Sequence, residues 1–391
     1  MNAMPSSDRP LRLLQATLQY APVVGGVGTH TREVSRRLIA DGHDVEVLTA
    51  DATWDLPTDE IINGIPVRRV RAWPKGGDQL VAPGIAHHVF HGTWDLVHVQ
   101  CYQSGVAPLA MAAAARTGTP YVVTFHGGGH SQGFRNALRD RQLQILRPLL
   151  ARARVLIATA EWEIARYAEV LDLPTSKFAL IPNGGDLAAP AEGVPTADGT
   201  LLISIGRLER YKGHHLAIAA LPHVLDEVPD ARLWIAGDGP YEQELRELAE
   251  RLGVADRVEI FAERDRSVFS ARLAQAAVGL LISEFETHPL AAVEALSAGT
   301  PMVVGLDGGG LSELAAKRLV RGVALTAPAA VHANAIVDTI RNPPPRTAVT
   351  LPTWDDCTAA LSALYRNVVR SRVHAYPRSD EGKGTNQALA P

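Results

Sequence analysis

Segments with the pattern of buried β-strands alternate with segments of helical periodicity along most of the 391-residue chain. Between the first two strand patterns, residues 27–41 carry Val34, Leu38 and Ile39 at helical spacing. Strands that alternate with helices are typical of an α/β fold in which helices cover both faces of a parallel sheet. In the first half of the chain, strands are predicted at 11–18, 45–49, 96–99, 121–125, 155–158 and 178–181.

The alternation is interrupted at 184–199, where Gly, Pro, Ala and Asp are frequent and no periodicity is present. We interpret this stretch as a linker. The chain is therefore predicted to form two α/β domains, 1–184 and 199–350, that face each other across a cleft. In the second domain, strands are predicted at 201–205, 232–236, 258–261, 277–282 and 302–305, and helices at 214–228, 241–252 and 267–276.

The end of the chain has a different character. Three consecutive prolines at 343–345 precede a predicted helix within 353–371. The following residues, 372–391, are polar and lack periodicity, so we predict a disordered tail.

Charge and cysteine usage exclude several classes of protein. The formal net charge is −4 at pH 7, whereas a nucleic-acid binder would carry a broad basic excess. Cys101 and Cys357 match no metal or redox spacing and indicate a reducing compartment. Residues 11–24 lack the form of a signal peptide, and no apolar run is long enough to span a bilayer. We expect a cytoplasmic protein without a nucleic-acid partner.

Two glutamates, Glu286 and Glu294, flank the start of a predicted helix at 289–298. This helix follows the strand at 277–282, so both carboxylates are expected near the carboxyl end of that strand, where open α/β sheets bind ligands. Carboxylates accept hydrogen bonds from hydroxyl groups, and a spaced pair suits a polyhydroxy ligand. The alternative is structural: an acid near a helix N-terminus suits the helix dipole, and a helical glutamate can be solvated.

The loop after the strand at 201–205 reads GRLERYKG from Gly206 to Gly213. Arg207 can make a forked contact and Lys212 a point-charge contact, and together they suit a diphosphate. Glu209 and Arg210 are interpreted as ordinary solvated charges, which is also the alternative for the whole loop.

Two further candidates follow strands of the first domain. Gly25 and Gly26 precede the first helix, where glycine allows close approach of the backbone and the helix N-terminus offers free N–H groups to an anion. The alternative is a turn needed only for packing. His126 follows the strand at 121–125 and leads into three glycines. We favour a functional role for it, although a lone histidine is more often structural.

In this order and spacing, the motifs resemble those of the retaining glycosyltransferases of family 4, which have the GT-B fold. The most specific elements are Gly206-Arg207-x4-Lys212-Gly213 and Glu286-x7-Glu294-Ala295-x3-Gly299-x-Pro301. The resemblance covers nearly the whole chain. It implies two Rossmann-like domains, an N-terminal one for the acceptor and a C-terminal one for a nucleotide-sugar donor, and a final helix that crosses back to the first domain.

The resemblance also implies roles for individual residues. Arg207 and Lys212 would hold the donor diphosphate, Glu286 the hydroxyls of the donor sugar and Glu294 those of the ribose. His126 would lie near the reaction centre, and Gly25 and Gly26 would approach the phosphates. Members of the family need no metal, and the chain shows no Asp-x-Asp motif at a strand end. We therefore expect no cofactor or metal, with a UDP-sugar as the donor.

The chain departs from the family pattern after Glu286. Many members read Glu-Gly-Phe-Gly-Leu where this chain has His288, Pro289 and Leu290 at the last three positions. These three residues would line the donor site, yet Pro289 has no N–H to offer the sugar. Arg264 stands near the expected position of the base. The identities of the donor sugar and of the nucleotide are left open.

A basic stretch at 134–154 interleaves arginines with leucines and has only one acidic residue. A basic amphipathic helix is typical of contact with an anionic membrane, whereas a core helix with solvated arginines is the alternative.

We therefore predict a retaining glycosyltransferase that moves a hexose or aminohexose from a nucleotide-diphosphate sugar to an acceptor hydroxyl. The favoured acceptor is a small soluble molecule such as a sugar, cyclitol or secondary metabolite, and a lipid or polysaccharide is the alternative. Two other functions are kept open: a GT-B epimerase that acts on a nucleotide sugar, and a catalytically silent sugar- or nucleotide-binding protein. The oligomeric state is unknown.

Overall fold

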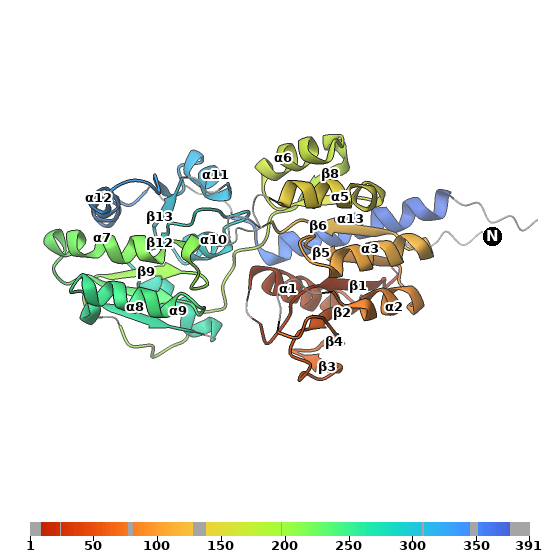
Figure 1. Cartoon of the computed structure of the whole chain (residues 1–391), viewed down its shortest axis with the longest axis horizontal. Helices are drawn as coiled ribbons and strands as arrows, with labels where there is room; N and C mark the ends of the chain where they lie inside the picture. Colours follow the sequence, from red (N-terminus) through yellow and green to blue (C-terminus); the bar gives the residue numbers. More distant parts are fainter. Residues whose placement is uncertain are drawn as a thin grey trace, which may run out of the picture.

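The structure, a computed structural model, describes residues 9–23, 25–76, 81–127, 138–196, 198–263, 265–306, 309–344 and 351–375. It consists of two lobes, each built on one β-sheet (Figure 1). The blue C-terminal helix lies in the lobe formed by the red-to-yellow N-terminal part of the chain (Figure 1).

The N-terminal domain is built on a sheet whose described strands are ordered β3-β4-β2-β1-β5-β6-β7-β8. Neighbouring strands pair in parallel, except the edge strand β3, which pairs antiparallel with β4. In the centre, Leu13 of β1 is in register with Val45 of β2 and Leu96 of β5. The strands are β1 (Arg12–Thr17), β2 (Asp44–Asp51), β3 (Asp59–Ile62), β4 (Ile65–Arg71), β5 (Leu96–Gln100), β6 (Tyr121–Thr124), β7 (Leu156–Ala158) and β8 (Phe178–Leu180).

Helices cover both faces of this sheet because successive strand residues point to opposite sides. Leu14 faces a core that includes residues of α2 (Pro83–His91), α3 (Val106–Thr117), α5 (Arg139–Arg152) and α6 (Glu161–Leu171). Its neighbour Leu13 faces a second core with α1 (Gly26–Ala40) and α13 (Trp354–Ala375).

The C-terminal domain repeats this layered design. Its described strands are parallel and ordered β11-β10-β9-β12-β13-β14. They are β9 (Leu201–Ile205), β10 (Arg232–Ala236), β11 (Val258–Phe261), β12 (Val278–Leu281), β13 (Met302–Gly305) and β14 (Arg321–Val323). One face packs on α7 (His214–Glu227), α8 (Glu242–Arg251) and α12 (Ala329–Arg341), and the other on α9 (Arg266–Gln275), α10 (Leu290–Ser297) and α11 (Gly310–Ala316). The strand order reverses between β9 and β12, in the middle of this sheet: from β9 the chain adds β10 and β11 on one side, and from β12 it adds β13 and β14 on the other.

The helix α13 belongs structurally to the N-terminal domain. Trp354, Leu361 and Tyr365 are buried in the core shared with α1. The Tyr365 hydroxyl lies 2.6 Å from Nδ1 of the buried His98. Outside the core, Arg37 of α1 pairs with Asp355 at 2.5 Å. The predicted final helix that crosses back to the first domain is thereby confirmed.

The prediction of two α/β units with parallel sheets is confirmed, with differences at the periphery. The hairpin of β3 and β4 adds an antiparallel edge that the sequence analysis does not anticipate, because these strands are half-exposed and carry many charged residues. A further strand, β14, follows β13. The helix α13 continues to Ala375, past the predicted end at 371, and residues 376–391 lie outside the described part of the chain.

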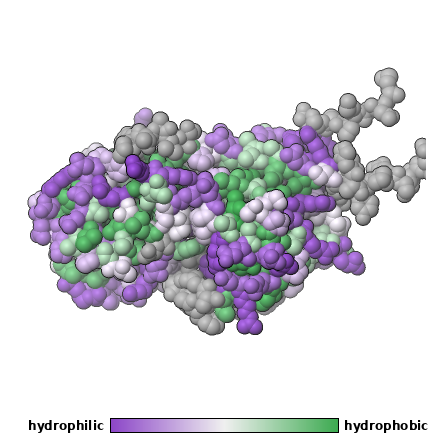
Figure 2. All heavy atoms as spheres, turned by 90° about the horizontal axis from the view of Figure 1, so that it is seen from above, coloured by the Kyte–Doolittle hydropathy of each residue, from purple (hydrophilic) through white to green (hydrophobic). Residues whose placement is uncertain are grey.

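Hydrophilic residues cover most of the visible surface of both lobes, with hydrophobic areas between them (Figure 2). In the basic stretch, α5 turns Leu143, Leu146 and Leu150 into the core, whereas Ile145 is 70% exposed. The apolar face of this helix is therefore mostly occupied by packing within the domain. Residues 128–137, which include the start of the basic stretch, are outside the described residues. Among the helices that the structure describes, none combines the length and apolarity required to cross a membrane.

Candidate active site

The loop after β9 positions Lys212 by means of glycines on both sides. Gly206 has a φ of +143°, and a Cβ atom there would lie 3.4 Å from Cδ of Lys212. Gly213 has a φ of +74°, and a Cβ atom would lie 1.9 Å from the carbonyl oxygen of Ile282. Only glycine fits this second position, because it combines a left-handed backbone with direct contact to the end of the neighbouring strand. The loop is thus locked against β12.

Lys212 and Glu286 form a charged pair between this loop and the loop after β12. The Lys212 Nζ donates to Oε1 of Glu286 at 2.6 Å, and both side chains are 14% exposed. The Ser283 hydroxyl donates to the same oxygen at 2.8 Å. Burial lowers the pKa of Lys212, but the charge and hydrogen bond of Glu286 together with the nearby Tyr211 more than offset this effect, so the pKa is raised. The ammonium is therefore charged, and Oε2 of Glu286 accepts no hydrogen bond from the described residues.

Arg207 lies beside this pair and is accessible. Its guanidinium donates to the Tyr211 hydroxyl at 2.8 Å, and its side chain is 54% exposed. The backbone of the same loop is fixed by the buried His214, which contacts the Arg207 carbonyl oxygen at 3.2 Å and the Ser204 hydroxyl at 2.8 Å. Arg207 and Lys212 thus present two cations at the carboxyl end of β9.

Glu294 is buried inside α10 and its side chain is 6% exposed. Its carboxylate pairs with Arg266 from the start of α9. Burial raises the pKa of Glu294, and the attraction of Arg266 opposes that shift. The interpretation of Glu294 as a freely solvated helical residue is wrong, since a buried carboxylate is retained only with a charged or hydrogen-bonding partner.

On the N-terminal side, the start of α1 is open. A Cβ atom on Gly25 or Gly26 would meet no heavy atom within 4 Å. The N–H groups of the first helical turn have no partner within a helix. This end of α1 therefore offers backbone donors to an anion without steric obstruction.

His126 follows β6 in a left-handed conformation, with a φ of +43°. Gln100 donates from Nε2 to Oε1 of Gln15 at 2.8 Å, which leaves its own Oε1 to accept from Nε2 of His126 at 2.7 Å. Burial lowers the pKa of His126 well below its usual range, and His30, His98 and His288 add to the effect. His126 is therefore neutral at pH 7, and its Nδ1 is the nitrogen that can accept a hydrogen bond.

His30 stands against His126, with ring centroids 4.6 Å apart. Its Nδ1 contacts Oδ1 of Asn183 at 2.8 Å, while its buried Nε2 has no partner among the described residues. Burial lowers the pKa of His30 to about 4, and burial does the same for His288, whose Nδ1 also lacks a partner within the described chain.

The two sides of the site meet through Thr287, the neighbour of Glu286. The Trp162 indole donates to the Thr287 carbonyl oxygen at 3.1 Å. A Cβ atom on Gly127 would lie 3.4 Å from the Thr287 hydroxyl. His126 and Glu286 are therefore each one residue away from a contact between the domains, which places them at the same junction.

The remaining residues predicted to line the donor site differ in their surroundings. Pro289 is buried and precedes α10 as its N-cap. Leu290 packs against the core that contains Trp354, so it contributes to contact between the domains. Arg264 lies outside the described residues.

Several residues of this site are not found by the sequence analysis. Arg266, Ser283, Trp162 and His30 carry no local pattern that marks them, although His30 lies beside the glycines of the first loop. Gly184, where the predicted linker begins, has a packing role that the sequence does not indicate. A Cβ atom on Gly184 would lie 2.2 Å from the backbone nitrogen of Trp354, so glycine is required by the approach of α13.

Comparison with known proteins covers both domains. Residues 25–184 match the family described as Glycosyl transferase 4-like domain, and residues 190–349 match the family Glycosyl transferases group 1. A glycogen synthase from Mycobacterium tuberculosis is 30% identical over 76% of this chain and 79% of its own length. A D-inositol 3-phosphate glycosyltransferase from Nocardiopsis dassonvillei is 29% identical over 77% of this chain and 80% of its own length.

A solved structure shows the same architecture. HepE from Anabaena, in complex with UDP-glucose, has a TM-score of 0.67 at 19% identity and covers 93% of this chain and 100% of its own. At that identity the likeness establishes the fold alone.

Proposed function

The chain belongs to the glycosyltransferases of the GT-B fold, and we propose that it is a retaining enzyme that transfers a hexose or aminohexose from a UDP-sugar to an acceptor hydroxyl. The observation that carries this proposal is the pairing of Lys212 with Glu286, with Arg207 beside it, at the carboxyl ends of β9 and β12. A diphosphate would be bound by the two cations, and a sugar hydroxyl by the unused oxygen of Glu286.

The same geometry supports a role in catalysis. When the bond between the anomeric carbon and the diphosphate breaks, negative charge develops on the departing phosphate. Lys212 and Arg207 are fixed before the reaction by Glu286 and Tyr211. Charges that are already in place stabilise the leaving group without reorganisation, which is commonly the largest contribution to a rate enhancement.

Glu294 and His126 complete the proposed donor site. Oε2 of Glu294 accepts no hydrogen bond from the described residues, so it can accept from the ribose hydroxyls while Oε1 stays with Arg266. His126 is held as the neutral imidazole with Nε2 protonated, so we assign it a hydrogen bond from a donor-sugar hydroxyl to Nδ1. This assignment makes His126 a positioning group, since its lowered pKa leaves no proton on Nδ1 to donate at neutral pH.

We further propose a small polyhydroxy acceptor. Leu143, Leu146 and Leu150 of α5 are buried in the core and are therefore not available to bind a lipid-linked acceptor. The D-inositol 3-phosphate glycosyltransferase among the relatives is named for a small cyclitol, whereas another relative is named for glycogen, a polymer. An acceptor panel of sugars, inositol phosphates and maltooligosaccharides would separate these classes.

A thermal-shift panel of UDP, GDP and ADP tests the donor site. A nucleotide present at about 100 times its Kd stabilises the folded protein by about 2.7 kcal/mol. We expect the shift with UDP and its loss in Lys212→Ala. A larger shift with GDP or ADP would correct the base, and no shift with any nucleotide would refute the site.

Incubation with UDP-sugars then separates the alternative functions. Release of UDP that depends on an acceptor supports the transferase. A new nucleotide sugar formed without an acceptor would indicate an epimerase, and no turnover despite nucleotide binding would indicate a silent binding protein.

A further inference from the structure

A pocket lined by cations lies in the N-terminal domain, at the amino ends of the strands. The candidate active site lies at their carboxyl ends. Its volume is about 300 Å³, at the lower end of the range for small-molecule sites. Its lining includes Tyr121 at the start of β6, Arg152 at the end of α5 and Lys177 in the turn before β8. The candidate active site uses the carboxyl ends of strands, so the two sites do not overlap.

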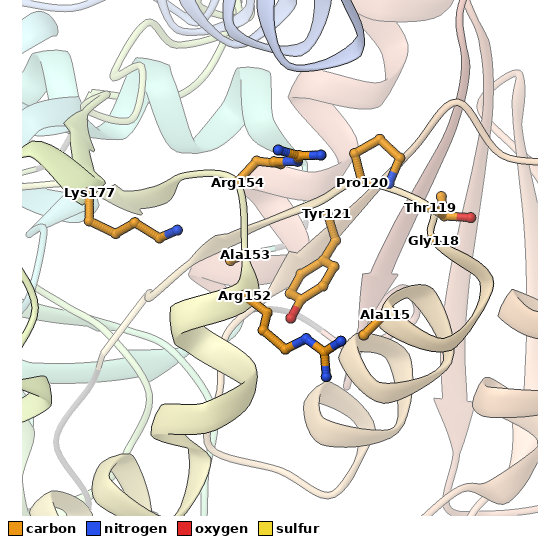
Figure 3. Close-up of a pocket in the computed structure, with 9 residues that line it drawn as sticks. All are labelled: Ala115, Gly118, Thr119, Pro120, Tyr121, Arg152, Ala153, Arg154 and Lys177. Atoms are coloured by element: carbon orange, nitrogen blue, oxygen red, sulfur yellow. The ribbon is translucent and has the colours of Figure 1, made fainter. Parts of the chain in front are cut away.

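Three cations surround this pocket. Arg152 and Arg154 flank the buried Ala153, and Lys177 extends its ammonium toward this segment from the neighbouring turn (Figure 3). In this view the side chains of the two arginines lie on either side of the Tyr121 ring. Among the residues that the structure describes, no acidic one lines the pocket. Within the described part of the chain, none of the three cations forms an ion pair or a side-chain hydrogen bond.

The backbone around the cations is fixed. The Arg154 N–H donates to the Tyr121 carbonyl oxygen at 2.8 Å, and the Ala153 N–H donates to Leu150 at 3.2 Å. The Tyr121 hydroxyl donates to the Leu149 carbonyl oxygen at 2.5 Å. The floor of the pocket is therefore rigid, while the charged ends of the arginines are exposed to solvent.

Ordinary structural roles account for only part of this arrangement. Arg152 is in the last turn of α5, where a cation suits the helix dipole. Arg154 and Lys177 have no such partner. Burial lowers the pKa of Lys177, and the nearby charge of Arg154 lowers it further. Lys177 and Arg154 therefore repel each other, and a bound anion would relieve this repulsion.

We propose that Arg152, Arg154 and Lys177 form a binding site for a phosphate group, distinct from the donor site. Three unpaired cations favour a ligand with more than one negative charge, such as a phosphomonoester or a diphosphate. Arginine provides the forked donors that match phosphate oxygens, and lysine adds a point charge. The phosphate can belong to a soluble molecule or to the headgroup of an anionic lipid.

Calorimetric titration with inorganic pyrophosphate tests this site. The background protein carries Arg207→Ala and Lys212→Ala, so that the proposed donor site does not contribute. We expect saturable binding that is weakened at least about tenfold by Arg152→Gln/Arg154→Gln, because charge-assisted hydrogen bonds contribute about 1.5–3 kcal/mol each. The matched control is Arg232→Gln/Arg251→Gln, which removes two exposed arginines of the other domain.

Sedimentation with phosphatidylcholine vesicles, with and without phosphatidic acid, distinguishes the sources of the phosphate. Cosedimentation that requires phosphatidic acid and is lost only in the pocket variant identifies a lipid headgroup. Pyrophosphate binding without cosedimentation identifies a soluble ligand. Equal losses in the pocket and control variants, or no binding of either probe to the background protein, would overturn the proposal. Unchanged thermal unfolding of the variants confirms that they are folded.

Discussion

At the residue scale, the proposed donor site depends on charges that are held in place by partners from distant parts of the chain. Lys212 and Glu286 are 74 positions apart in the sequence and 2.6 Å apart in space. Their loops can be identified from sequence because glycines and short apolar strands mark them. The partner of Glu294 cannot be identified from sequence. Arg266 is brought to Glu294 by the packing of α9 beside α10, and such packing leaves no local pattern in the sequence.

Replacement of Glu286 tests the charge at that position. Glu286→Gln keeps the shape of the side chain but removes the anion that fixes Lys212, so we expect kcat to fall by about a hundredfold or more. Glu284→Gln is the control, because Glu284 is exposed and two residues away. Equal activities of the two variants, measured as UDP release, would show that the charge of Glu286 is not used.

The histidines at the domain junction predict a pH dependence of stability. The pKa of His30 is about 4 in the folded protein and about 6.5 in the unfolded chain. Because the unfolded state takes up the proton first, the free energy of unfolding should fall as the pH drops below 6.5. From pH 6.5 to about pH 5 the loss from His30 alone would be about 1.6 kcal/mol.

Urea unfolding at several pH values measures this loss. In His30→Gln the dependence on pH should be weaker than in the wild type. The control His223→Gln changes an exposed histidine and should leave the dependence unchanged. Identical pH profiles for wild type and His30→Gln would mean that His30 is not buried as a neutral group.

At the scale of elements, the strands and helices next to the site follow the sequence closely. The predicted bounds of β9, β10, β11 and β13 agree with the structure, because each is a short, largely apolar run between turn residues. The hairpin of β3 and β4 has no such run, since β3 alternates between exposed and half-buried residues, and the buried residues of β4 alternate with exposed or half-buried ones. The sequence therefore does not predict elements whose position depends on packing and whose own residues show no clear pattern.

The glycine at the end of the Lys212 loop provides a test at this scale. Gly213→Ala would combine left-handed strain of about 1–2 kcal/mol with a clash against Ile282, and should lower both stability and donor binding. Gly42→Ala is a matched control, because Gly42 has a φ of +85° but open space around its Cα. We expect thermal unfolding to show a clearly larger loss for Gly213→Ala. Equal losses would mean that the loop is not locked against β12.

At the scale of the whole molecule, the position of the site follows from how the two domains are joined. The helix α13 returns to the N-terminal domain, and its first residue, Trp354, packs beside Gly184 at the start of the linker. Thr287 accepts a hydrogen bond from Trp162 across the junction, and its hydroxyl would be met by a Cβ atom on Gly127. The sequence indicates two domains and which strand ends carry chemistry, but the contacts between domains involve single residues and depend on the complete fold.

The most direct test of the proposed function is UDP release from a UDP-sugar in the presence of an acceptor, measured for the wild type and Lys212→Ala in the same assay. Lys212→Ala removes the buried cation nearest to Glu286, while circular dichroism and unfolding verify that the variant is folded. We predict turnover by the wild type and a loss of about a hundredfold or more in the variant. Turnover of the folded variant at the wild-type rate would contradict the proposed donor site.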